Sequence, residues 1–160
     1  MTNINPLYTN AYKFVLGRGN DKLELFGQMV SVPGVQLNTQ PQPTTLGTQI
    51  PIAVNTFTFD PLSLNFIVDE KIENWKSIYD WMKAIGNISN DTENTTYQSW
   101  SSYATLYILN TCYTPMNGKT FTFYHLIPTA LSTISFRSDV SDTNPVNAKV
   151  TFAYSYYDIS

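Results

Sequence analysis

Alternating apolar and polar residues predict a protein built mainly from β-strands. Leu62, Leu64, Phe66 and Val68 alternate with Ser63 and Asn65, which is typical of a strand with one buried face. Apolar residues occupy both faces of Tyr103–Asn110, so we expect both sides of that strand to be covered. Lys119–Leu126 follows the turn sequence Pro115–Gly118, and the two strands together predict a β-hairpin. Leu131–Arg137 shows a shorter and weaker strand pattern.

A second hairpin is predicted near the N-terminus. Its strands are Tyr12–Leu16 and Leu23–Val32, and Gly17–Asn20 forms the turn between them. Glycine suits such a turn because it adopts positive φ without steric cost. A phosphate-binding loop would need a further glycine and a following helix, and the sequence has neither at this point. The second strand ends at Pro33-Gly34, a common turn pair.

The clearest strand pattern lies at the C-terminus. Its predicted core face consists of Ala148, Val150, Phe152, Tyr154 and Tyr156. The residues at 149, 151, 153 and 155 then point away from the core, because successive side chains of a strand face opposite sides. A terminal segment this regular is expected to be paired within a sheet.

One amphipathic helix interrupts the strands. Its predicted core face, with steps of three or four residues, consists of Ile72, Trp75, Ile78, Tyr79, Met82 and Ile85. Asp69 is placed to cap the start of this helix, and Gly86 is placed to end it. A single helix among many strands predicts a mainly β, α+β fold in which the helix packs against a β-sandwich.

Two long polar segments are predicted as loops. The first runs from 36 to 49 and consists of Gln36, Leu37, Asn38, Thr39, Gln40, Pro41, Gln42, Pro43, Thr44, Thr45, Leu46, Gly47, Thr48 and Gln49. The second, Asn87–Ser102, is rich in Asn, Ser and Thr. Long loops in compact domains are usually functional or mobile.

Composition narrows the function classes. The 160 residues suit one domain, and only 13% of them are charged, about half the usual share. Such a surface is either covered by uncharged polar residues or hidden in contacts between subunits. The net charge is −3 and the nine basic residues are scattered, so tight nucleic-acid binding is disfavoured. No signal peptide or membrane-spanning stretch is recognisable, and we expect no membrane partner and synthesis in the cytoplasm.

Candidate chemistry is sparse. The sequence has one cysteine, Cys112, and one histidine, His125, which leaves that pair as the best candidate for a catalytic thiol and base. Cys112 follows an apolar run and is better explained as a small buried hydrophobe. The carboxylates lack calcium-loop spacing, and no serine-nucleophile motif occurs. We therefore predict a non-enzyme with no catalytic, cofactor-binding or metal-binding residues.

Six pieces of the sequence occur in an informative order over nearly the whole chain. They are the Gln28–Val35 strand ending in Pro-Gly, Ile50-Pro51-Ile52, the Leu62–Glu70 strand-to-helix junction, the Asn74–Met82 helix with its tryptophans, Phe123–Phe136 with Pro128-Thr129-x-Leu131, and the aromatic strand Val150–Tyr157. In this order the pieces resemble the tail tube protein family of contractile-tailed bacteriophages.

This resemblance implies a β-sandwich or partial barrel carrying one helix. It also implies a virion protein whose homo-hexameric rings stack into a hollow tail tube. Sheath and baseplate proteins would be its partners, and DNA would pass through the lumen without specific binding. Under this interpretation, the Gln36–Gln49 loop is the candidate contact between rings, disordered in the free monomer and ordered in the tube.

Other functions remain open at this stage. A tube initiator or terminator, or the ring protein of a type VI secretion system, would share the same features. A carbohydrate-binding β-sandwich is an alternative of another class, with Trp100, Tyr154, Tyr156 and Tyr157 as its stacking residues.

Overall fold

The computed structural model describes residues 12–18, 21–24, 27–86, 101–109, 115–136 and 145–160. Within these ranges it contains the following elements: β1 (Tyr12–Arg18), β2 (Asp21–Glu24), β3 (Gly27–Ser31), β4 (Val35–Pro43), β5 (Gln49–Phe59), β6 (Leu62–Ile67), α1 (Glu73–Ile85), β7 (Ser102–Leu109), β8 (Pro115–Leu131), β9 (Asn147–Ala153) and β10 (Tyr156–Ile159). The predicted mainly β fold with one helix is confirmed.

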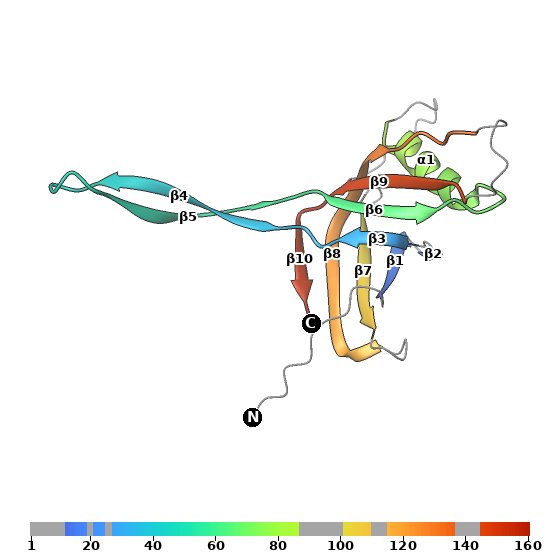
Figure 1. Cartoon of the computed structure of the whole chain (residues 1–160), viewed down its shortest axis with the longest axis horizontal. Coiled ribbons are helices and arrows are strands. Elements are labelled where there is room, and N and C mark those ends of the chain that lie inside the picture. Colours follow the sequence, from blue (N-terminus) through green and yellow to red (C-terminus); the bar gives the residue numbers. More distant parts are fainter. Residues whose placement is uncertain (1–11, 19–20, 25–26, 87–100, 110–114, 137–144) are drawn as a thin grey trace.

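Two layers of antiparallel strands form the body of the protein. The strand order is β2-β1-β7-β8-β9-β6-β3, and β10 pairs separately with β8. The long strand β8 belongs to both layers, because its first part pairs with β7 and β10 and its last part pairs with β9. Figure 1 shows the strands of the two layers running across one another, with α1 beside β9 and β6. Among the described strands the sheet does not close into a barrel.

A bulge explains how β8 passes from one layer to the other. Ser102 is opposite Leu126, whereas Ala104 is opposite Phe123, so β8 has an additional residue at this point. Within that extra stretch, His125 has a φ of 56°. A positive φ in a strand bends the backbone, and histidine tolerates it better than most residues do. The structural role of His125 is therefore to form this bend.

The core lies between the two layers and under the helix. Its fully buried side chains come from alternate positions of the strands, as the sequence pattern predicts for β6. Trp81 of α1 packs against Phe152 of β9, with 6.2 Å between the ring centroids. The buried hydrophobic residues are Phe14, Leu16, Leu62, Leu64, Phe66, Ile78, Trp81, Ala104, Leu106, Phe123, Leu126, Ala148, Val150 and Phe152.

Several predicted strand boundaries are wrong. The single strand Leu23–Val32 is divided into β2 and β3, which lie at opposite ends of the sheet order. The turn assigned to Pro115–Gly118 is part of β8, and the weak strand Leu131–Arg137 is absent beyond Leu131 in the described residues. Tyr103, on the strand expected to be covered on both sides, is exposed.

The N-terminal hairpin forms as predicted but with a shorter turn. Strands β1 and β2 are antiparallel, and their pairing extends to Arg18 opposite Asp21. Gly17 therefore lies in the strand rather than in the turn, and the Tyr103 ring covers it so closely that a Cβ would overlap the ring. The Ser102 hydroxyl donates a hydrogen bond to the Gly17 carbonyl. Close approach by a neighbouring strand, and not positive φ, explains this glycine.

Candidate assembly surfaces

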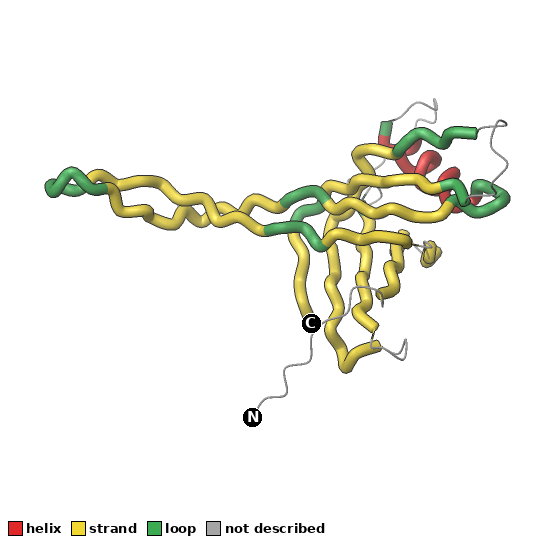
Figure 2. The backbone as a smooth tube through the Cα atoms, viewed as in Figure 1, coloured by secondary structure: helices red, strands yellow, loops and turns green. Residues whose placement is uncertain are grey.

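The segment predicted as the Gln36–Gln49 loop is a β-hairpin. Strands β4 and β5 pair from Val35 opposite Phe59 out to Pro43 opposite Gln49. At the tip, Thr44 donates its hydroxyl to the Thr48 carbonyl (2.8 Å), and Gly47 has a φ of 74°. We call β4, β5 and their turn the arm. Figures 1 and 2 show the arm projecting away from the body, so the prediction of a loop is wrong. The predicted disorder of this segment in the free monomer stays a prediction.

The sequence of the arm does not show a strand pattern, because the arm has no buried face. Every residue of β4 is exposed, and only Phe59 of β5 is partly covered. A strand that does not face a core has no reason to alternate between apolar and polar residues. Pro41, Pro43 and Pro51 also argue against strands, yet two-stranded hairpins tolerate proline on their outer edges.

The arm exposes apolar surface and carries no charge. Between Glu24 and Asp60 the sequence has no Asp, Glu, Lys, Arg or His. Leu46 at the tip is 88% exposed. The other exposed large hydrophobic residues of the arm are Val35, Leu37, Ile50, Ile52, Val54 and Phe57. An isolated two-stranded hairpin is marginally stable, and contiguous exposed apolar surface is typical of interaction sites.

Two tyrosines near the C-terminus hold the base of the arm. The Tyr154 hydroxyl donates to the Asp60 carbonyl (2.9 Å), and the Tyr157 hydroxyl donates to the Pro33 carbonyl (3.3 Å). Both rings also lie 5.8 Å from the ring of Phe59, measured between centroids. Burial raises the pKa of Tyr154 from 10.0 to about 12, with smaller contributions from Tyr157 and Asp60. Each strand of the arm is therefore fixed to the body by one hydroxyl.

The C-terminal strand differs from its predicted form. Ala148, Val150 and Phe152 of β9 are buried, and Tyr154 is partly buried. The strand is then interrupted, and β10 pairs with β8 instead of continuing along β6. Tyr157 packs against the core while Tyr156 is 46% exposed, so the assignment of Tyr156 to the core face is wrong. Because the strand is interrupted between β9 and β10, odd-numbered Tyr157 faces the core where the unbroken strand would have placed Tyr156.

Asp69 and Asn74 organise the start of the helix. The Asp69 carboxylate accepts hydrogen bonds from the backbone N–H groups of Glu73 (3.2 Å) and Asn74 (3.1 Å). In return, the Asn74 side chain donates to the Ile67 carbonyl (2.8 Å) and accepts from the Trp75 N–H (2.7 Å). These bonds satisfy N–H groups that a helix leaves free at its first turn. Asp69 thus caps the helix as predicted, although Ile72 occupies the N-cap position itself.

The buried face of the helix is rotated relative to the prediction. The side chains of α1 that are buried are Asn74, Ile78 and Trp81. Trp75, Met82 and Ile85 are partly buried and pack against the core. Ile72 and Tyr79 are exposed, so their assignment to the core face is wrong. The sequence pattern gave equal weight to all apolar positions, whereas the body covers a stripe centred on Ile78.

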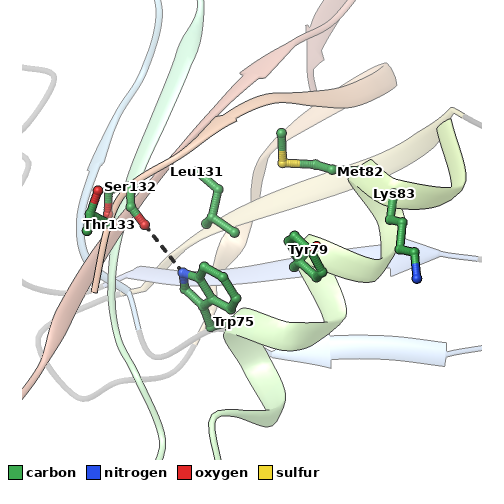
Figure 3. A pocket seen from close by; sticks show the side chains of 7 residues that line it. All are labelled: Trp75, Tyr79, Met82, Lys83, Leu131, Ser132 and Thr133. Atoms are coloured by element: carbon green, nitrogen blue, oxygen red, sulfur yellow. Dashed lines mark hydrogen bonds between the residues drawn. The ribbon is translucent and has the colours of Figure 1, made fainter. Parts of the chain in front are cut away.

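A shallow groove lies between this helix and the end of β8 (Figure 3). Its volume is about 470 Å³, and its walls come from α1 and from the end of β8. The rings of Trp75 and Tyr79 stack 5.5 Å apart, and the Trp75 indole N–H donates to the Ser132 carbonyl (3.4 Å). The full set of lining residues is Trp75, Tyr79, Met82, Lys83, Leu131, Ser132 and Thr133. The groove is mostly apolar, with Lys83 as its one charged lining residue.

The described residues bring together no catalytic or metal-binding arrangement. They contain no group of three or more metal-ligating side chains, and none of their helices is long and apolar enough to cross a membrane. Cys112 and Trp100 lie outside the described residues, so the thiol–histidine pair and the Trp100 carbohydrate platform have no structural counterpart to report. His125, Tyr156 and Tyr124 form a small aromatic cluster at the surface of β8 and β10.

Comparison with known proteins identifies the family. A model of the phage tail tube protein family matches residues 3–160. The chain belongs to the phage tail tube protein family. This tail tube family member is also 33% identical over 139 residues to the tail tube terminator protein of Enterobacteria phage T4, across 84% of this chain and 77% of that protein. It is therefore a structural protein of the phage tail and not an enzyme, as the sequence resemblance predicted.

Solved structures with the same fold come from contractile injection systems. A chain of the six-fold symmetrised baseplate of the anti-feeding prophage aligns with a TM-score of 0.72 at 12% identity, covering 98% of this chain and 97% of that one. A chain of the tube-terminating cap of the same particle aligns with a TM-score of 0.70 at 14% identity, covering 100% and 94%. At these identities the likeness concerns the fold, which agrees with the predicted tail-tube-like architecture.

Proposed function

We propose that this protein is a tube terminator, which forms a homo-hexameric ring at the end of the tail tube. The observation that carries the proposal is the 33% identity to the tail tube terminator protein of phage T4 over most of both chains. The proposal treats all 160 residues as one tail-tube domain that is made in the host cytoplasm and incorporated into the virion tail.

The shape of the subunit supports ring formation. The sheet ends at β2 and β3, and β10 has β8 as its one described neighbour, so several strand edges are available for pairing with another chain. Open edges favour association with further strands, and a closed ring satisfies all of them at once. The exposed, uncharged arm gives each subunit a second surface that needs a protein partner.

The dimensions of such a ring suit the passage of DNA. If each of six subunits contributes about four strands spaced about 4.8 Å apart, the circumference is roughly 115 Å and the diameter roughly 37 Å before strand tilt is included. A lumen lined by a mildly acidic protein would repel phosphate and let the duplex slide. The ring would contact tube subunits on one side, and sheath and baseplate proteins remain further candidate partners in the tail.

The repeated tube subunit is the second candidate function. It is favoured by the family description, phage tail tube protein, which covers nearly the whole chain. The two candidates differ in one property. A tube subunit stacks on copies of itself without limit, whereas a terminator forms a ring that stops growth.

Electron microscopy of the purified protein, alone and mixed with tubes assembled from the tube protein of the same virus, separates these functions. A terminator gives single six-fold rings alone and ring-capped tube ends in the mixture. A tube subunit gives long tubes alone. A protein that stays monomeric at high concentration and never binds tube ends would refute both functions.

A further inference from the structure

The outer half of the arm presents a compact patch of proline. Pro41 and Pro51 are direct cross-strand neighbours, and Pro43 follows two residues after Pro41 on the same face. Such neighbours have Cβ atoms about 5 Å apart. Ala53, opposite Thr39, continues this face toward the body. We call Pro41, Pro43, Pro51 and Ala53 the proline face.

The same prolines prevent the arm from being extended by another strand. The Thr44 N–H donates to the Thr48 carbonyl (2.9 Å), so the alternation of an antiparallel ladder places the hydrogen-bonded pairs of the outer arm at even-numbered residues. The peptide groups of odd-numbered residues therefore point outward from the two edges. At Pro41, Pro43 and Pro51 the outward N–H is missing, which blocks regular pairing on both edges. The outer arm must dock through a face and not through an edge.

The groove beside α1 has the chemistry to receive this face. Proline-rich segments bind to aromatic-lined grooves, where pyrrolidine rings pack on aromatic faces. Trp75 and Tyr79 supply two stacked aromatic rings, and Leu131 and Met82 supply apolar walls. The arm carries no charge that would be desolvated on entering, and a groove of about 470 Å³ holds several side chains.

The arm of one molecule cannot reach its own groove. Figure 1 shows the arm and α1 extending from opposite sides of the body. The nine residues of β4 span about 30 Å, which carries the tip well beyond the body in that direction. Complementary surfaces at opposite sides of one chain make a head-to-tail contact, which closes into a ring or continues along an axis.

We propose that the proline face of one subunit's arm packs into the Trp75–Tyr79 groove of a second copy of this chain. The proposal deepens the proposed function and rests on it, because it names the surface that receives the arm in the assembled tail component. The partner that occupies the groove is then a second copy of this chain and not another tail protein.

Disulfide cross-linking between two different variants tests the pairing. Both carry Cys112→Ser; one adds Ala53→Cys on the proline face, and the other adds Thr133→Cys in the groove. Mixed under mild oxidation, they should give a heterodimeric cross-link several-fold above two matched controls. One control replaces Ala53→Cys with Gln42→Cys on the opposite face of the arm. The other replaces Thr133→Cys with Asp80→Cys, which lies on α1 outside the groove.

The outcomes separate this proposal from the ring itself. Rings seen by electron microscopy without the Ala53–Thr133 cross-link would overturn the arm-to-groove contact and leave the proposed function intact. Equal cross-link yields in the control pairs would also overturn the contact. A selective cross-link supports the contact whether or not complete rings form. As a second measurement, Tyr79→Lys should weaken self-association at least several-fold without changing the melting temperature, because Tyr79 is 48% exposed. Unchanged self-association would also count against the proposal.

Discussion

The tyrosine hydroxyls at the base of the arm give the sharpest quantitative prediction. Tyr154→Phe combined with Tyr157→Phe removes the hydrogen bonds to the Asp60 and Pro33 carbonyls and keeps both rings against Phe59. A typical hydrogen bond contributes about 1 kcal/mol, and the 3.3 Å bond of Tyr157 should contribute less, so the sum is about 1.5 to 2 kcal/mol. This corresponds to roughly 10- to 30-fold more frequent detachment of the arm base.

Amide hydrogen exchange in the dilute monomer measures this detachment directly. The Asp60 N–H donates to the Gly34 carbonyl (3.2 Å) across the base of the arm, so its exchange rate reports opening at that point. We expect faster exchange at Asp60 in the double variant and little change in β6 and β9, because local opening does not require global unfolding.

A matched control isolates the role of the two hydroxyls. Tyr156 lies in the same segment but stacks on Tyr124 at the surface, and Tyr156→Phe should leave Asp60 exchange unchanged. Unaffected Asp60 exchange in the double variant would show that the two hydroxyls do not hold the base of the arm. Equally faster exchange in β6 and β9 would show that the tyrosines stabilise the whole body and not the arm.

Three further predictions concern the body and the arm base. Phe152→Asp places an unpaired carboxylate in the fully buried core and should lower the free energy of unfolding in denaturant by several kcal/mol. Lys149→Ser on the exposed side of β9 should change it by less than about 0.5 kcal/mol. Equal effects would contradict the assignment of which β9 side chains face the core. The raised pKa of Tyr154 favours its neutral folded form, so its contribution is complete below pH 10 and is lost as pH rises toward 12. A pKa shift of two units corresponds to at most about 2.7 kcal/mol, and solvent screening of this partly exposed group reduces our expectation to about 1 kcal/mol. Denaturant unfolding of wild type and Tyr154→Phe between pH 9 and about 11.5 should therefore show a steeper loss of unfolding free energy in wild type. Asp69→Ala removes two hydrogen bonds at the start of α1 and should lower the free energy of unfolding by about 1 kcal/mol; thermal melts with no difference would show that the cap is dispensable.

The sequence was most informative where a residue faces the core. The alternation in Leu62–Phe66 matches the burial of β6, because burial on one face imposes the pattern. The Asp69 cap was also predictable, because capping depends on local backbone geometry. The mainly β fold and the helix could therefore be predicted from local signals.

Features that depend on distant contacts could not be predicted. The arm has no buried face and thus no alternation, and its prolines resemble a loop. Tyr157 faces the core in place of Tyr156, because β9 ends at Ala153 and the next strand, β10, pairs with β8. This change of partner strand depends on the whole sheet and not on the local sequence. The aromatic groove requires β8 to end beside α1, and only the three-dimensional arrangement brings Leu131 to Trp75 and Tyr79.

Cryo-electron microscopy of tube ends tests the central claim most directly. Tubes of the same virus's tube protein would be incubated with this protein and imaged at both ends and along their length. We expect a single six-fold ring of this subunit at a tube end, with the arm of each subunit contacting a neighbouring copy and no incorporation along the tube. Continuous incorporation along the tube would assign the repeated-subunit role instead, and the absence of any ring at the ends would contradict the terminator function.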